Sequence, residues 1–410
     1  MKIIHVSHCY HPSKGGVQWF FKNVSERLVR NYADDVTVVT TDSMYGPERL
    51  KYKKIKPQTE IINGVKVVRF AYTRWHILPL RWIIKLFGKL SIQPPQFLLV
   101  KLYGPLSKSM KKYLLQVDAD AICAGSSNYY YMQLPSWKKT NFLYFGSIHL
   151  SEDPAKPVLT SIQKKSIQAS KYYLANTNFE KERLIDAGIE RNKIKVIGVG
   201  VDEKLFAVET DEISTYRSSL NISKNAMVIG YVGRIERTKN IRILIDAFAM
   251  VAKNDANIYL LIAGAGGDYL LELKQYTISL PENVQSQIIW KIDFDLTEKS
   301  LLFHNIDILV LPSNNESFGI VFLEAWVCKK PVIGSDIGAV RNVISENVDG
   351  LLMKINDKEN LASKISILVK DKSLRDLMGE AGYNKVMNNY TWDIITRKMR
   401  DAYLENYIAN

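Results

Sequence analysis

The chain has 410 residues, of which 47% are hydrophobic and 24% charged, a balance typical of globular proteins. It is too long for one ordinary hydrophobic core, so two domains of roughly 200 residues are expected. No run of 18 apolar residues occurs, which argues against a membrane-spanning helix, and the start MKIIHVSHCY is too short and polar for a secretory signal. Cys9, Cys123 and Cys328 lack metal-binding spacing, so we expect reduced thiols in a cytoplasmic protein.

The net charge of +13 is concentrated in the N-terminal half. Residues 1–200 hold 31 Lys and Arg against 14 Asp and Glu, whereas residues 201–410 hold 24 against 28. Between Ile61 and Val117 ten residues are basic and none is acidic, with aromatic and aliphatic residues between them. No nucleic-acid motif accompanies this charge, so nucleic acid is not the expected partner. The mixture of basic and apolar residues favours an anionic membrane surface.

In the first half, short β-branched or apolar runs, which are typical of strands, alternate with segments whose apolar residues have helical spacing. Strands are expected at Lys2–Ser7, Asp35–Thr41, Val65–Phe70, Ala119–Ala124, Asn141–Phe145, Lys171–Ala175 and Lys193–Ile197. Gln18–Arg30 has apolar residues at helical spacing and should be a helix. The segment 77–115 should be mostly helical, with a break near Pro94 and Pro95.

The second half repeats this alternation from about residue 220. Strands are expected at Met227–Val232, Ile258–Ala263, Gln287–Trp290, Ile306–Leu311 and Pro331–Gly334, and helices at Ile241–Lys253, from Val321, and at Glu359–Lys370. The alternation predicts an α/β chain with two Rossmann-like, doubly wound parallel-sheet domains. In such sheets ligands bind at the carboxyl ends of the strands, so a cleft is expected there.

Two loops of the second half carry residues suited to a phosphate and sugar site. In the loop from Gly233 to Asn240, Arg234 and Lys239 could clamp a diphosphate, although a solvated loop with surface cations is the plain alternative. In the loop after Pro312, Glu316 and Glu324 are eight residues apart, and carboxylates accept hydrogen bonds from sugar hydroxyls.

The backbone of the same loop offers a phosphate site at an expected helix start. The amides of Phe318, Gly319 and Ile320 would lie at the helix N-terminus, where anions bind, and Gly319 would let the backbone approach a ligand closely. The alternative is an ordinary helix start with Glu316 near the positive end of the helix dipole.

The segments VGRIERTKN, LPSNNESFGIVFLEAW and KKPVIGSDIGAV occur in this order between residues 225 and 352. Together they resemble the retaining, GT-B-type glycosyltransferases of family four. Gly15-Gly16 and the helix after it resemble the N-terminal glycine loop of that family more weakly. Tyr390-Thr391-Trp392 resembles the start of the tail that returns to the first domain. We therefore expect an acceptor-side domain at 1–205, a donor-binding domain at 206–385, and a C-terminal helix at 386–410.

The resemblance implies a role for each matching residue. Arg234 and Lys239 would hold the donor diphosphate, Glu316 the hydroxyls of the transferred sugar, and Glu324 the ribose. Gly233, Phe318, Gly319 and Ile320 would line the nucleotide site, and Gly15 and Gly16 would bring the first domain's backbone to the phosphates. His149 is similar to a family histidine at the mouth of the cleft, although a surface or core histidine is the alternative.

Some residues depart from the family pattern or suggest another chemistry. Ser317 stands where the family usually has Gly, which a negative φ would allow. Two Asp-x-Asp triplets occur, Asp118-Ala119-Asp120 and Asp293-Phe294-Asp295. In another glycosyltransferase fold such a triplet holds a divalent metal under the diphosphate. Because Arg234 and Lys239 already supply positive charge, we expect no metal and no cofactor, with the nucleotide sugar acting as a substrate.

These observations predict a retaining, metal-independent glycosyltransferase of cell-surface polysaccharide synthesis. It would move a hexose or N-acetylhexosamine from a nucleoside-diphosphate sugar, with UDP favoured over GDP, to a saccharide or lipid-linked saccharide. The alternatives are a non-hydrolysing nucleotide-sugar epimerase on the same fold and an inactive membrane-surface scaffold. If Ile77–Leu90 is helical, Arg81, Lys85 and Lys89 form one basic stripe, as in a peripheral protein on the inner face of the cell membrane.

Overall fold

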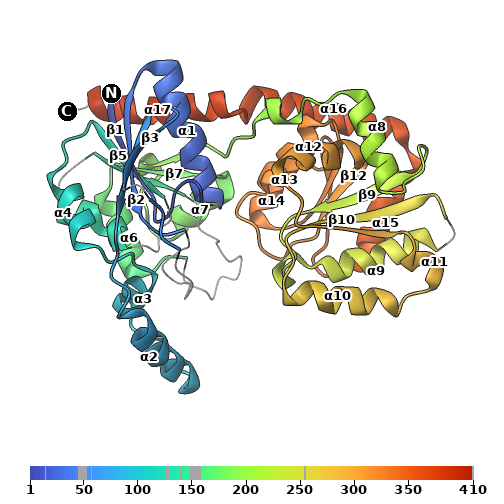
Figure 1. The fold of residues 1–410 in the computed structure, drawn as a ribbon, viewed down its shortest axis with the longest axis horizontal. Helices are drawn as coiled ribbons and strands as arrows, with labels where there is room; N and C mark the ends of the chain where they lie inside the picture. The colour runs from blue at the N-terminus through green and yellow to red at the C-terminus, as the bar shows by residue number, and fades with distance from the viewer. Residues whose placement is uncertain are drawn as a thin grey trace. The chain divides into compact units, whose positions relative to one another are not determined.

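The computed structural model describes residues 1–13, 15–44, 53–56, 58–125, 130–138, 141–146, 158–253 and 255–408. The chain divides into two compact units (Figure 1). The first unit comprises Met1–Val199 together with Trp392–Asn410, and the second comprises Gly200–Thr391. The two compact units meet at 199/200 and 391/392, a few residues from the expected domain boundaries at 205/206 and 385/386. The helix α16 (Lys372–Asn389) lies within the second unit.

The first unit is built on an eight-stranded sheet in the order β3-β4-β2-β1-β5-β6-β7-β8. Its strands are β1 (Lys2–Val6), β2 (Asp35–Thr41), β3 (Thr59–Ile62), β4 (Val65–Phe70), β5 (Ala121–Gly125), β6 (Phe142–Phe145), β7 (Tyr172–Ala175) and β8 (Ile194–Val196). All neighbouring pairs are parallel except β3 and β4, an antiparallel hairpin that turns at Asn63 and Gly64, both with positive φ. The sequence analysis missed β3, whose residues are half exposed and weakly patterned.

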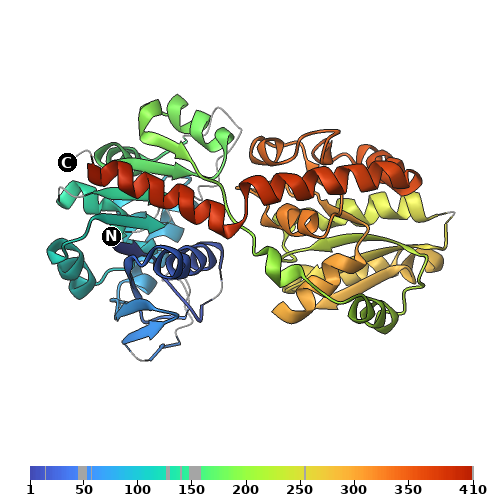
Figure 2. The same ribbon diagram turned by 90° about the horizontal axis from the view of Figure 1, so that it is seen from above.

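The helices of the described part of this unit are α1 (Gly16–Tyr32), α2 (Ile77–Lys89), α3 (Gln96–Tyr103), α4 (Lys108–Gln116), α5 (Leu134–Trp137), α6 (Ser161–Ala169), α7 (Asn178–Asp186) and α17 (Trp392–Ile408). On β1, His5 faces α1 and α17, because its ring nitrogens contact Ser25 Oγ at 2.7 Å and Tyr403 OH at 3.0 Å. Ile4 and Val6 face the opposite core. Figure 2 shows α17 lying along the first unit.

The second unit has six parallel strands in the order β11-β10-β9-β12-β13-β14. They are β9 (Met227–Val232), β10 (Ile258–Gly264), β11 (Ile288–Ile292), β12 (Ile308–Leu311), β13 (Val332–Ser335) and β14 (Gly350–Met353). The helices are α8 (Thr210–Ser219), α9 (Ile241–Ala252), α10 (Asp268–Ile278), α11 (Glu282–Gln285), α12 (Leu296–Asn305), α13 (Ile320–Val327), α14 (Gly338–Val343), α15 (Lys358–Lys370) and α16. Helices α9 and α10 cover one face, and α12 and α13 the other (Figure 1).

The strand order of the second unit is that of a nucleotide-binding Rossmann sheet, 3-2-1-4-5-6. From β9 the chain moves outward through β10 to β11, and it then returns to β12 on the other side of β9. The order therefore reverses between β9 and β12, which are hydrogen-bonded neighbours. Ligands of such sheets bind at this reversal, outside the carboxyl ends of the strands. None of the helices in the described part of the chain is both long and apolar enough to cross a membrane.

Candidate active site

The two loops singled out in the sequence leave the sheet at this reversal. The loop 233–240 follows β9, and the loop 312–319 follows β12. Backbone and side-chain hydrogen bonds join them, since the Asn314 amide donates to Thr238 O at 3.0 Å and Asn240 Nδ2 donates to Asn314 Oδ1 at 3.3 Å. Asn240 has a φ of 54°, a left-handed conformation that asparagine tolerates better than most residues. The site residues on the two loops are thus held side by side.

Lys239 and Glu316 form the ion pair at the centre of these loops. Lys239 Nζ lies 2.5 Å from Glu316 Oε1, and the two side chains are only 14% and 11% exposed. The sequence analysis expected the two residues in one site with separate ligands, and the structure shows them paired with each other. A partly desolvated pair of this kind is a strong hydrogen bond, and each member can exchange its partner for a charged or hydroxylated ligand.

Arg234 lies at the exposed rim of the same loop. Its Nη1 is 2.6 Å from Glu236 Oε1, and its side chain is 67% exposed, so it is free to swing toward a ligand. Tyr231 fixes the backbone below it by donating a hydrogen bond from its hydroxyl to Arg234 O at 2.6 Å. Burial and the charges of Glu316 and Glu236 raise the pKa of Tyr231, so this hydroxyl stays protonated as a donor.

Gly233 lies where β9 and β10 end side by side. A Cβ built on Gly264 would lie 1.7 Å from Gly233 O, so the close approach of the two backbones requires glycine at 264. Packing against the β9 loop therefore explains the glycine at 264.

The helix α13 begins at the second loop. Gly319 is its N-cap with φ 88°, which favours glycine, and no described side chain caps the helix. The first amides of α13 therefore remain available to an anion. Ser317 is not among the residues with positive φ, so it fits the position where the family has Gly. The ring of Phe318 is 2% exposed and packs on Tyr390 at 5.6 Å, so Phe318 can contribute only its backbone.

Glu324 lies on α13 and is paired with Lys299 of α12. Its Oε1 accepts from Lys299 Nζ, whereas its buried Oε2 has no hydrogen-bond partner among the described residues. A buried carboxylate oxygen without a partner costs free energy until a donor reaches it. Sequence reasoning missed Lys299, because it precedes Glu324 by 25 residues on another helix and no sequence spacing links them.

Two family models match consecutive parts of the chain. The model "Glycosyltransferase Family 4" matches residues 14–205, and the model "Glycosyl transferases group 1" matches residues 212–385. The chain belongs to glycosyltransferase family 4. Its fold is GT-B, as expected from the resemblance of its loops to that family.

Three relatives of this glycosyltransferase span most of its length. The chain is 26% identical over 373 residues to the capsular polysaccharide biosynthesis glycosyltransferase CapM of Staphylococcus aureus, covering 87% of this chain and 91% of CapM. It is 27% identical over 313 residues to N,N'-diacetylbacillosaminyl-diphospho-undecaprenol alpha-1,3-N-acetylgalactosaminyltransferase of Campylobacter jejuni, covering 73% and 79%. The solved structure of Anabaena Alr3699/HepE with UDP and glucose aligns with a TM-score of 0.72, 18% identity and 98% coverage of both chains.

The structure describes only some of the candidate site residues in the first unit. Gly15 and Gly16 follow β1 and open α1, and no described side chain caps that helix either. A Cβ on Gly16 would meet nothing within 4 Å, so packing in this structure does not explain the glycine and space for a ligand remains beside it. His149 lies outside the described residues.

The two Asp triplets have structural roles where the structure describes them. Asp120 Oδ2 accepts from the Lys2 amide at 2.8 Å, and Asp295 caps α12 by accepting from the amides of Thr297 and Glu298. Across the described residues, no group of three or more His, Cys, Asp or Glu side chains is placed to hold a metal ion. Metal independence itself stays a prediction.

Proposed function

We propose that this glycosyltransferase moves a hexose or N-acetylhexosamine from a nucleoside-diphosphate sugar to a saccharide or lipid-linked saccharide, with retention of anomeric configuration. The observation that carries the proposal is the Lys239–Glu316 pair beside the uncapped start of α13. Together, the ion pair and the helix start offer one cation, one carboxylate and free backbone amides within two joined loops. A sugar diphosphate needs these three groups, because it carries anionic phosphates next to neutral hydroxyls.

Binding of the donor would rearrange the ion pairs of the site. Lys239 and Arg234 turn to the diphosphate, the first amides of α13 contact the same phosphates, and Glu316 accepts from hydroxyls of the transferred sugar. The unpartnered Oε2 of Glu324 accepts from a ribose hydroxyl. Each charge then keeps an opposite charge or a donor, so binding leaves no buried group unsatisfied.

In the reaction we propose, the bond from the anomeric carbon to the diphosphate oxygen breaks and the acceptor hydroxyl oxygen bonds to the same carbon. The hydroxyl proton passes to the departing phosphate, which leaves as the nucleoside diphosphate. The described site carboxylates are paired with lysines, so we assign them to recognition and not to attack on the sugar. The protein contributes orientation and stabilises the charge of the leaving group.

The names of the relatives support the choice of donor and acceptor. CapM is a glycosyltransferase of capsular polysaccharide biosynthesis, the Campylobacter enzyme is named for a diphospho-undecaprenol acceptor, and the Anabaena structure holds UDP and glucose. We therefore favour UDP over GDP and a glycan or lipid-linked glycan as acceptor. The epimerase would instead need acid–base groups around C2 of the sugar, and it would need no acceptor.

The membrane is the second partner we propose, because the acceptor would be carried there. Helix α2 buries only Ile77 and Leu80, and it exposes Leu78, Trp82, Ile83 and Leu86 beside its basic residues. A helix whose apolar side faced the domain core would bury these residues. Exposed apolar and basic side chains on one helix favour a helix lying in an anionic bilayer surface.

The test of the proposed function is nucleotide release from UDP- and GDP-sugars, with and without a lipid-linked saccharide extract. A transferase releases nucleoside diphosphate faster when acceptor is present, and the label of the sugar appears in the lipid fraction. Release of a 2-epimeric sugar without acceptor dependence would establish the epimerase. No turnover of any donor, together with vesicle binding, would establish the scaffold.

A further inference from the structure

The first unit carries a cavity that the donor site does not use. It measures about 740 Å³ and lies between α2, α3 and the start of α4. Binding sites for small molecules typically measure roughly 300–1,000 Å³. Apolar and aromatic side chains, including Trp75, Leu80, Leu98 and Leu106, form most of its wall, and the charged side chains in that wall are Lys101, Lys108 and Lys111.

The three lysines have no carboxylate partner within the described part of the chain. None of them forms an ion pair with a described residue, and the whole segment from Ile61 to Val117 contains no Asp or Glu. Aromatic rings hold two of them in place. Lys111 Nζ lies 3.9 Å from the centre of the Trp137 ring, and Lys101 Nζ lies 5.5 Å from that of Phe97. Ordered cations without counter-charge beside a cavity are suited to an anionic ligand.

Helix α4 strengthens the positive potential at the cavity. Ser107 caps its N-terminus, Lys108 is its first residue, and its first turn contains no acidic residue. Lysines at this end oppose the helix dipole, which favours negative charge there. Both Ser107 and Lys108 line the cavity, so an anion bound in it would relieve the repulsion.

The wall of the cavity also contains a buried polar atom without a partner. His76 is 9% exposed, and its Nε2 contacts Lys101 O at 3.2 Å. Its Nδ1 is buried and has no hydrogen-bond partner in the described part of the chain. Burial, and then the charge of Lys101, lower the pKa of His76, so Nδ1 is an acceptor that a ligand hydroxyl can satisfy.

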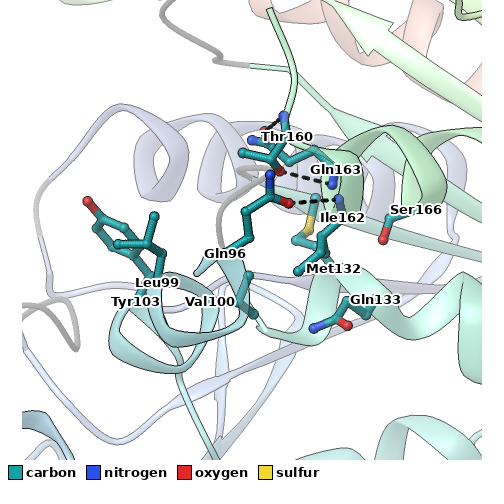
Figure 3. Close-up of a pocket in the computed structure, with 10 residues that line it drawn as sticks. All are labelled: Gln96, Leu99, Val100, Tyr103, Met132, Gln133, Thr160, Ile162, Gln163 and Ser166. Atoms are coloured by element: carbon teal, nitrogen blue, oxygen red, sulfur yellow. Dashed lines mark hydrogen bonds between the residues drawn. The ribbon is translucent and has the colours of Figure 1, made fainter. Parts of the chain in front are cut away.

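Helix α3 also lines a second, smaller cavity of about 200 Å³, which Figure 3 shows with its lining residues. At this second cavity Gln96 Oε1 accepts from Ser161 Oγ at 2.9 Å, which ties α3 to the start of α6. Six of the eight residues of α3 are apolar or aromatic, Phe97, Leu98, Leu99, Val100, Leu102 and Tyr103, yet none of the helix is buried. Figure 1 shows α2 and α3 as an arm that projects from the first unit. The arm thus presents apolar surface to whatever fills the larger cavity.

We propose that this cavity binds the phosphate end of a lipid carrier, with Lys101, Lys108 and Lys111 on the phosphate and the apolar wall along the first part of the lipid chain. The proposal rests on the proposed function, since such a lipid would carry the acceptor sugar. Free phosphate would not use the apolar wall, and an uncharged lipid would not use the lysines. The combination selects an amphiphile with an anionic head.

The probe is farnesyl phosphate, titrated below its micelle concentration into the full chain, with inorganic phosphate and farnesol as controls. We expect farnesyl phosphate to bind at least tenfold more tightly than either control. Lys101→Gln/Lys108→Gln, two exposed side chains whose loss should leave the fold intact, should weaken its binding at least tenfold. Lys66→Gln/Lys112→Gln removes the same charge from exposed positions outside the cavity wall and should bind like the wild type.

Equal binding by the two double variants, or equal binding of farnesyl phosphate and inorganic phosphate, would overturn the proposal. Binding to phosphatidylglycerol vesicles without binding of monomeric farnesyl phosphate would also overturn it, in favour of a general membrane contact. UDP titration of the same variants separates the two proposals, because the cavity variants should bind nucleotide normally. A chain that binds farnesyl phosphate as expected but transfers no sugar would contradict the proposed function alone.

Discussion

At the scale of single residues, the account depends on ion pairs that a ligand would reorganise. The sequence placed Lys239, Glu316 and Glu324 in one site but could not show that each carboxylate has a lysine partner, because pairing depends on side-chain geometry between separate elements. The packing of Phe318 is a second feature that the sequence could not show. We expected its backbone amide to contact the ligand, which stays a prediction, and the fold buries its ring against Tyr390.

Glu316→Gln and Lys239→Ala should each lower sugar transfer at least tenfold, which corresponds to about 1.4 kcal/mol in the activation barrier. Each change removes a group that we assign to the donor, and neither should unfold the chain. Arg237→Ala is the matched control, since Arg237 lies in the same loop but pairs with Glu272. Wild-type turnover by both site variants, with the natural donor, would show that the site is misassigned.

Glu324→Gln should lower kcat/KM by about tenfold, mainly by raising the KM for the donor. The ribose contact lies away from the reacting carbon, so its loss should weaken ground state and transition state alike. Steady-state kinetics against donor concentration measures the effect, with Glu272→Gln as an exposed control in the same unit. A lower kcat at unchanged KM would contradict a ribose role and favour a part in the chemical step.

At the scale of helices and strands, the sequence alone was sufficient to predict an element where its residue pattern is strong. The strands at Asp35–Thr41, Val65–Phe70 and Met227–Val232 have the predicted bounds, because each is rich in β-branched residues, which are enriched in strands. The edge strand β14 and the hairpin strand β3 were missed. Both strands have only four residues; β3 is half exposed, and β14 is buried but begins with a glycine, so neither has a strong strand pattern.

The arm illustrates what the sequence predicted and what it left open. The break at Pro94-Pro95 and the helix from Ile77 were predicted, and α2 ends at Lys89, one residue earlier than expected. Whether its apolar residues belonged to the core remained open, because helical periodicity does not say what a face contacts. The structure exposes Trp82, Leu86 and Leu90, at 72%, 58% and 60%.

The triple variant Arg81/Lys85/Lys89→Glu should lose co-sedimentation with anionic vesicles at low salt, which the wild type should show. Each basic residue near such a surface contributes about 1 kcal/mol, so the reversal should abolish binding. The control Lys2/Lys66/Lys112→Glu reverses three exposed charges of the same unit outside α2 and should sediment more like the wild type. Equal sedimentation of the α2 variant and the wild type, or none by either, would refute membrane binding through α2.

At the scale of the whole molecule, two Rossmann-like units give the chain two strand-order reversals, and the paired loops occupy the one in the second unit. The fold alone does not specify a sugar. The nucleotide-sugar donor is our proposal, and it rests on the family and on the two joined loops.

Transfer activity should survive EDTA. Arg234, Lys239 and the first amides of α13 supply the positive potential that a divalent ion would otherwise supply to the leaving diphosphate. The measurement is sugar transfer after dialysis against EDTA, with and without added Mg²⁺ or Mn²⁺. Complete loss of activity, restored by either ion, would contradict this role for the cationic side chains and direct attention to Asp118, Asp120, Asp293 and Asp295.

The central claim is that the loops after β9 and β12 bind a nucleoside diphosphate through its second phosphate. Calorimetric titration of the full chain with UDP and UMP, and with GDP and GMP, tests it directly. One diphosphate should bind at least tenfold more tightly than its own monophosphate, and Lys239→Ala should remove most of that difference. Equal affinities for diphosphate and monophosphate, or a difference that Lys239→Ala leaves unchanged, would contradict the account.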